Sequence, residues 1–299
     1  TAAAVKAYQI RKEMTQTEGY QANIQHAQSS LTNAESSLTH IEELMKDVKD
    51  RIIQANTSSA SADERKIAAT ELRSIQESLL QALNSNSTDG YYFGGANTQT
   101  KPFTVNTSGQ LMYNGQLLSG LTSTDADQLP GESMYVDIGL GLRTIPAIPP
   151  NPANSTVDPD SVFQYTIPGI NITGSGTVTT PSGTTVSANL YDLIGELATR
   201  LESSPYTYES VDELYGVFSD SSMNVVFNLT EIGAKTSYLD FMTDRYDTRT
   251  LDLEERQDKV EYVDPARAII DFKSQQVAYN AALQMGAQII PPSIFNYMK

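Results

Sequence analysis

The feature that most constrains the fold is a seven-residue repeat of apolar side chains near both ends of the chain. Two rows of apolar or small residues recur at this spacing in the first 60 residues. Near the C-terminal end a further row does so, and no proline occurs between residues 206 and 264. Heptad spacing is typical of long helices that pack along one face. The rows are Ile24, Leu31, Leu38, Met45 and Ile52; Ala27, Ala34, Ile41, Val48 and Ala55; and Val211, Phe218, Val225, Ile232, Leu239, Tyr246, Leu253 and Val260.

Local signals divide the two helical ends into separate helices. The stretch NTSSAS at 56–61 ends the first helix, and Ser61 with Glu64 forms the pattern of a capping box that opens a second. A shorter helix is expected at about 189–202, before the long one. Pro265 suits the first turn of a last helix, with Asp264 as its N-cap.

The long C-terminal helix has a weak companion row, which bears on how it packs. Beside its apolar row lie Leu229, Thr236, Thr243, Thr250 and Gln257. A free two-stranded coiled coil needs two apolar rows. We therefore expect this helix to pack inside a bundle.

Residues 101–188 have a different composition from the helical ends. They contain two basic and six acidic residues, and short runs such as VFQYTI and GTVTT are typical of strands. Asn114-Gly115 indicates a type I′ hairpin turn. Residues 144–161 hold five prolines and are expected to form an extended surface loop.

These patterns predict an α+β protein: an elongated antiparallel α-helical bundle built from both chain ends, with an inserted β-rich domain. The expected bundle domain comprises 1–100 plus 189–262. The expected β-rich outer domain is 101–188, and 263–299 forms a separate C-terminal helix.

Composition excludes several classes of function. The 299 residues include 20 Lys and Arg against 36 Asp and Glu, a formal charge of −16. That charge argues against nucleic acid or an anionic membrane as a partner. The chain has no cysteine, which excludes disulfides and thiolate metal sites. The sequence contains no run of about 18 apolar residues, so it predicts no membrane-spanning helix.

The residues that could perform catalysis or bind a metal do not form a site. His26 and His40 are 14 residues apart on one helix, about 21 Å, so they cannot share a metal. Asp125 and Asp127 do not fit the spacing of a calcium loop. None of the motifs HExxH, GxSxG, GxxxxGK[ST] or GxGxxG occurs. We predict no catalytic, cofactor-binding or metal-binding residue, and no enzyme activity.

Two other sets of residues suggest structural roles. Aromatic side chains in TDGYYFGGANTQTKPF (88–103) could stack on bases or sugars, or they could seal the bundle against the next domain. We favour sealing, and hence an interdomain hinge, because the surrounding charge is not basic. The hinge residues are Asp89, Gly90, Tyr91, Tyr92, Phe93, Gly94, Gly95, Pro102 and Phe103. The last helix has an apolar stripe without an internal partner, so we predict an assembly interface at Ile269, Phe272, Leu283, Ile290, Ile294 and Phe295.

The same stretches resemble a known family. TDGYYFGGANTQTKPF is similar to the hinge motif DG-x-Y-x-F-x-G-x-x-T-x-x-x-PF of bacterial flagellins and their relatives. EIGAKTSYLD at 231–240 resembles a stretch of their C-terminal bundle helix, and 260–299 resembles their tail. Within the family, the tail is most similar to that of the hook-associated proteins. The resemblance covers both helical ends, about two thirds of the chain.

This resemblance implies a structural subunit of the bacterial flagellum, exported through the type III apparatus and located outside the cell. Its partners would be copies of itself in a ring, the first hook-associated junction protein, flagellin, and an export chaperone on the C-terminal helix. Residues 263–299 would form an inner-core helix, whose partner in the family precedes the first residue of this sequence. The alternatives are a flagellin filament subunit, or an exported surface adhesin that uses the β-rich domain.

Overall fold

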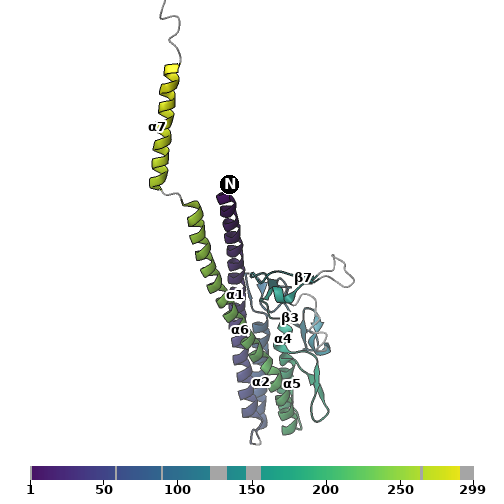
Figure 1. The fold of residues 1–299 in the computed structure, drawn as a ribbon. Helices are drawn as coiled ribbons and strands as arrows, with labels where there is room; N and C mark the ends of the chain where they lie inside the picture. Colours follow the sequence, from purple (N-terminus) through teal and green to yellow (C-terminus); the bar gives the residue numbers. More distant parts are fainter. Residues whose placement is uncertain are drawn as a thin grey trace, which may run out of the picture. The chain divides into compact units, whose positions relative to one another are not determined.

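The computed structural model describes residues 2–57, 59–88, 90–121, 133–145, 156–262 and 265–289 (Figure 1). Long helices lie near both chain ends, as the heptad rows predict. The helices are α1 (Ala2–Ala55), α2 (Ala62–Leu83), α4 (Gly169–Thr173), α5 (Leu190–Leu201), α6 (Tyr208–Glu261) and α7 (Pro265–Ile289), with 3-10 turns η1 (Leu118–Gly120) and η3 (Pro159–Ser161).

The heptad rows of α1 are buried along their whole length. All ten residues of the two rows are at most 5% exposed. The capping box of α2 is also confirmed, because the Glu64 amide donates to Ser61 Oγ at 3.2 Å. In return the Ser61 amide donates to a Glu64 carboxylate oxygen at 2.7 Å. The start of α2 therefore follows from a local sequence signal.

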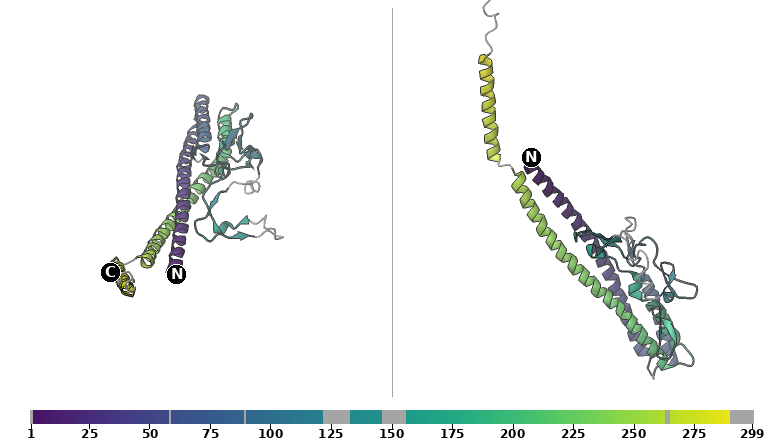
Figure 2. Two further views of the ribbon diagram at one scale, coloured as in Figure 1. Left: turned by 90° about the horizontal axis from the view of Figure 1, so that it is seen from above. Right: turned by 45° about the vertical axis from the view of Figure 1, so that its right-hand side comes forward.

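The apolar row of α6 faces the core as predicted. Its members from Val211 to Leu253 are buried, whereas the polar companion row is only half-buried. Within residues 18–246, α6 lies beside α1 (Figure 2). Gln28 of α1 donates to Asp240 of α6 at 2.8 Å, and the rings of Tyr20 and Tyr246 lie 5.6 Å apart.

Short antiparallel strands occupy the segment between the helical ends. They pair as β1–β2, β3–β4–β5, β6–β9, β7–β8 and β10–β11. Asn114 and Gly115 have φ angles of +47° and +82° at the β4–β5 turn, which confirms the type I′ hairpin. The strands are β1 (Asn86–Ser87), β2 (Gly90–Tyr91), β3 (Phe103–Val105), β4 (Leu111–Tyr113), β5 (Gln116–Leu117), β6 (Tyr135–Val136), β7 (Thr144–Ile145), β8 (Thr156–Val157), β9 (Phe163–Gln164), β10 (Thr177–Thr179) and β11 (Thr185–Ser187).

The structure differs from the sequence prediction at residues 144–161. The ends of this stretch are not extended loop, because β7 and β8 pair with Thr144 opposite Val157. The tight turn η3 follows β8, where the Asp158 side chain accepts from the Asp160 amide at 3.1 Å. The prolines of this stretch led us to expect no paired strands, because proline cannot donate a hydrogen bond to a neighbouring strand. Pro159, the one that the structure describes, lies outside the two paired strands. Residues 146–155 lie outside the described residues.

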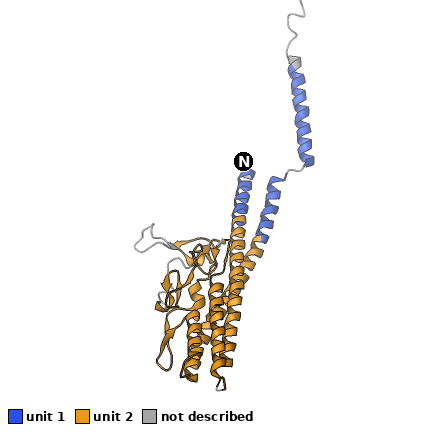
Figure 3. Cartoon of the chain, turned by 180° about the vertical axis from the view of Figure 1, so that it is seen from behind, with its two compact units in different colours: residues 1–17, 247–299 blue, residues 18–246 orange. Residues whose placement is uncertain are grey.

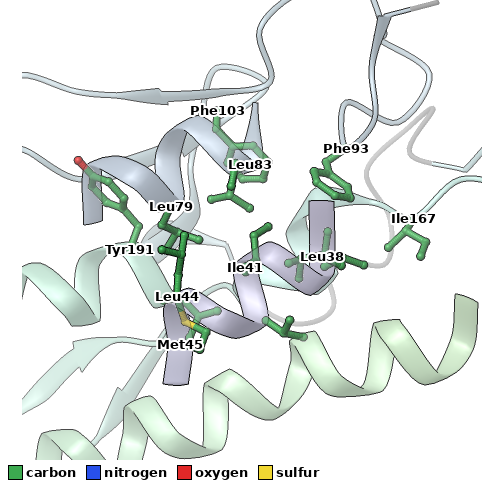
Figure 4. Packing of buried hydrophobic residues seen from close by; sticks show 14 of the residues in the cluster. Leu38, Ile41, Leu44, Met45, Leu79, Leu83, Phe93, Phe103, Ile167 and Tyr191 are labelled. Carbon is green, nitrogen blue, oxygen red and sulfur yellow. The ribbon is translucent and has the colours of Figure 1, made fainter. Parts of the chain in front are cut away.

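The chain divides into two compact units, residues 18–246 and residues 1–17 with 247–299 (Figure 3). The first unit contains a continuous apolar core from α1, α2, α5, α6 and the inserted strands. Figure 4 shows α1 and α2 side chains such as Leu38 and Leu83 meeting Phe93 and Phe103 in this core. Helical ends around a segment of small antiparallel sheets confirm the predicted fold class.

Candidate functional site

Gly90 occupies a backbone position that other residues avoid. Its φ is +120°, and the Tyr91 amide beside it donates to the Thr98 carbonyl at 2.9 Å. A Cβ at position 90 would lie 2.4 Å from the Thr98 carbonyl oxygen, closer than real Cβ contacts. The tight crossing of 90 and 98 therefore depends on glycine. The neighbouring hinge residue Asp89 lies outside the described residues.

Gly94 and Gly95 form the second turn of the predicted hinge. Gly95 has a φ of +63°, and the Asn97 amide donates to the Gly94 carbonyl at 3.2 Å. A Cβ on Gly94 would lie 2.6 Å from the Asn97 carbonyl oxygen. Both glycines are buried. A side chain at position 94 would displace packed backbone, and one at position 95 would have to adopt a strained φ.

Phe93 and Phe103 anchor the hinge stretch in the core, and both are fully buried (Figure 4). The Phe93 carbonyl accepts from the Tyr113 hydroxyl at 3.0 Å and from the Gly169 amide at 3.2 Å. A Cβ on Gly169 would come within 2.6 Å of the Phe103 ring. The inserted segment therefore holds both phenylalanines through backbone and ring contacts.

Asn84, the C-cap residue of α2, holds the C-terminal end of the hinge stretch through its side chain. Its side-chain amide donates to the Phe103 carbonyl and accepts from the Phe103 amide, both at 3.0 Å. Pro102 is buried, and its carbonyl accepts from the Asn114 amide at 2.8 Å. Sequence reasoning missed Asn84, because a single asparagine gives no signal for a partner 19 residues away.

Tyr91 and Tyr92 are half-buried beside a small cavity of about 160 Å³. His26 and Tyr165 also line it, with their rings edge to face at 5.3 Å. Burial raises the pKa of Tyr165. Among the described residues of 101–188, the lining includes one aromatic ring, Tyr165.

Three of the six predicted assembly residues lie on the described part of α7. Ile269, Phe272 and Leu283 lie on α7 and are 56%, 66% and 56% exposed. Every side chain described on α7, from 265 to 286, is exposed. Ile290, Ile294 and Phe295 lie outside the described residues. The described part of α7 thus presents large apolar side chains to solvent.

The two histidines are exposed on α1, and His40 lies 3.8 Å from Glu43. Within the described ranges, no three His, Asp or Glu side chains gather closely enough to hold a metal ion. The predicted acidic pair Asp125 and Asp127 falls outside those ranges. None of the helices the structure describes has the length and hydropathy needed to cross a membrane.

The first comparison with known proteins finds one family model, which matches part of the chain. Residues 1–98 match the bacterial flagellin N-terminal helical region. This range covers α1, α2 and most of the hinge stretch. The search of curated proteins found no match.

Solved structures that share the fold include flagellar hook-associated proteins. A Vibrio parahaemolyticus protein described as a flagellar hook-associated protein has 20% identity and a TM-score of 0.66, covering 87% of this chain and 97% of its own. FlgL from Xanthomonas campestris has 15% identity and a TM-score of 0.62, covering 83% and 99%. Flagellar hook-associated protein 3 from Legionella pneumophila has 17% identity and a TM-score of 0.59, covering 86% and 99%. The resemblance identified from the sequence is confirmed: the chain has a flagellin-type N-terminal region and the fold of these hook-associated proteins.

Proposed function

We propose that this chain is a structural subunit of the bacterial flagellum that forms the junction between hook and filament. The observation that carries the proposal is the hook-associated fold, shared over more than four fifths of the chain. The protein acts outside the cell by helix packing with neighbouring subunits. It performs no catalysis, and its function requires no cofactor.

The exposed apolar side chains of α7 support a role in assembly. Burying Ile269, Phe272 and Leu283 against a partner would lower the free energy of assembly by roughly 25 cal/mol per Å² of apolar surface removed from water. The partners are copies of this chain in a ring, the first hook-associated junction protein, and flagellin. Before assembly, an export chaperone covers the same helix.

The hinge stretch from Gly90 to Phe103 acts as a rigid corner between the bundle and the inserted domain. Its support is the set of close backbone crossings at Gly90, Gly94 and Gly169 and the clamp from Asn84. A corner that cannot bend keeps the inserted domain in one orientation. Every subunit of a ring then presents the same surface outward.

Removal of the gene from the source bacterium tests the junction role. We expect cells with hooks that lack filaments, flagellin released into the medium, and loss of swimming. A plasmid copy should restore filaments. Normal filaments on cells without the protein would contradict the proposal, since a junction subunit is required for every filament.

A further inference from the structure

The two tyrosines of the hinge stretch differ in their surroundings from its phenylalanines. Phe93 and Phe103 are fully buried in the core, whereas Tyr91 and Tyr92 are half-buried and line the cavity of about 160 Å³. The other walls come from α1 and from the inserted segment, where Tyr165 is buried. Three parts of residues 18–246 therefore surround one space, and sealing of the core accounts for only part of the hinge.

The size of the cavity limits what it can hold. An apolar cavity of about 150 Å³ is enough for one benzene ring. A space of about 160 Å³ therefore takes one six-membered ring, and it is too small for a nucleotide or for several residues of a peptide. Gly90 and Gly95 contribute backbone without side chains to the wall, which keeps this space open.

The lining of the cavity selects against charged ligands. Among the described residues that line it, none is Asp, Glu, Lys or Arg. A phosphate or carboxylate group would lose its hydration there without gaining a cationic partner, and an ammonium group would gain no anionic one. The lining therefore favours an uncharged ligand.

Hydroxyl and amide groups of α1 form the rim of the cavity. His26, Ser29, Ser30 and Asn33 follow the three- and four-residue spacing of one helix face. No residue in the described part of the chain forms a hydrogen bond with the two serine side chains or with the asparagine side chain. These groups can both donate and accept, as the hydroxyls of a sugar do. Together with the apolar faces of the tyrosine rings, they provide the two kinds of surface that a sugar ring presents in return.

The sequence of α1 is unusual where it forms this rim. Residues 19–34 contain no Asp, Glu, Lys or Arg, although 19% of the chain is charged. Serine, threonine and asparagine stabilise an exposed helix less than Glu, Lys and Arg do. The uncharged polar side chains therefore weaken the helix slightly, which indicates that this surface is used for hydrogen bonding.

The polar surface of α1 continues beyond the cavity. Gln25, Gln28 and Thr32 join Ser29 and Asn33 around a second, more open hollow on the same helix. Because Ser29 and Asn33 line both spaces, a ring in the cavity can be followed by a second unit along α1. This continuity favours the end of a chain of sugars over a single free ring.

We propose that the cavity binds the uncharged hexose ring at the end of a glycan, and that the second hollow takes the next sugar. Tyr91 and Tyr92 contact the faces of the terminal ring, and the side chains of Ser29 and Asn33 bond its hydroxyls. The inference goes beyond the junction role and does not depend on it, because the site lies within one folded chain.

Saturation-transfer NMR on the purified protein tests the class of ligand. The probes are the methyl glycosides of glucose, galactose and mannose, the disaccharides lactose and maltose, and, for contrast, glucose 6-phosphate and phenol. We expect at least one methyl glycoside to bind with a dissociation constant of roughly 1 mM, and a disaccharide that ends in the same sugar to bind roughly tenfold more tightly. Glucose 6-phosphate should bind more weakly than the uncharged probes, because the cavity offers its charge no partner.

Three results of this measurement would overturn the inference: binding of phenol alone, binding of glucose 6-phosphate as tight as that of the glycosides, or no binding of any sugar at about 50 mM. The disaccharides separate the two sources of a hexose ring. Equal affinity for a methyl glycoside and its disaccharide would assign the cavity to a free monosaccharide, and the second hollow would then have no part in binding.

A paired substitution tests where the sugar binds. Alanine favours a helix more than serine or asparagine does, so Ser29→Ala with Asn33→Ala should keep or raise the Tm. We expect this variant to bind the best probe roughly tenfold more weakly, because two hydrogen bonds are lost. Ser36→Ala is the matched control, since Ser36 is exposed on the same helix and lines neither space. Parental affinity in the paired variant, or an equal loss in the control, would contradict the inference.

Discussion

Gly90 has both a φ of +120° and a position where a Cβ would contact the Thr98 carbonyl at 2.4 Å. Gly109 also has a positive φ, +81°, but a Cβ there would meet nothing within 4 Å. Comparing the two glycines therefore separates the cost of backbone strain from the cost of steric contact. We expect Gly90→Ala to lower the free energy of unfolding by about 3 kcal/mol and Gly109→Ala by about 1 kcal/mol. Urea denaturation measures both. Equal losses would show that the crossing at Thr98 can relax, and the rigid corner would be wrong.

Glu202 accepts two hydrogen bonds from the Arg73 guanidinium, at 2.9 and 2.6 Å, and these lower its pKa. Because the folded pKa lies below the unfolded one, the pair stabilises the fold above about pH 4.5. That contribution is lost as the pH falls through the folded pKa. Both side chains are about a third or more exposed, so solvent screening limits it to about 0.5 kcal/mol.

The expected result is that Glu202→Gln lowers the free energy of unfolding at pH 7 but not at pH values below the folded pKa. Denaturation at a series of pH values measures this, with Asp220→Asn, an exposed carboxylate on α6, as control. A loss from Glu202→Gln that is independent of pH would show that the ion pair is not its cause.

At the scale of the element, the heptad rows determine which side chains stabilise the bundle. Leu38 on α1 is fully buried, whereas Leu251 on α6 is 66% exposed. We expect Leu38→Ala to cost about 3 kcal/mol through lost burial and a cavity. The same change at Leu251 should stay within about 0.5 kcal/mol. Thermal and urea unfolding measure both, and comparable costs would contradict the assignment of α1 residues to the core.

The sequence predicted the helices well because their signals are local or periodic. Ser61 and Glu64 specify the start of α2 through a contact between residues three positions apart, and the apolar rows of α1 and α6 repeat every seven residues. The paired ends of 144–161 escaped prediction. Thr144 and Val157 meet across 13 residues, and two-residue strands have no period to detect.

The hinge shows the same limit at a single site. Its glycines and phenylalanines were recognisable from their types and spacing. Asn84 was not, because its bonds to Phe103 depend on where α2 ends relative to β3.

At the scale of the whole molecule, the two compact units differ in the interactions that stabilise each of them. Residues 18–246 share a continuous apolar core. In the other unit, Ile10 and Leu253 are buried, and ion pairs link Arg11 to Glu261 at 2.9 Å and Arg249 to Glu13 at 2.7 Å. Exposed ion pairs contribute little and are screened by salt.

Hydrogen exchange should therefore differ between two parts of the same helix. We expect amides of α1 in residues 2–17 to exchange faster than those in 24–52, and the gap to widen as salt is raised. Mass spectrometry of peptides after timed exchange measures this. Uniform protection along α1 would show that the ion-paired end is as stable as the core.

Placing the protein on the flagellum decides between the junction and its alternatives. Immunogold electron microscopy of intact cells, with antibody against residues 101–188, reports where the chain lies. The proposed function predicts a narrow band of label between hook and filament. Label along the whole filament would make the chain a filament subunit, and label on the cell surface away from flagella would favour an adhesin; either result would contradict the junction role.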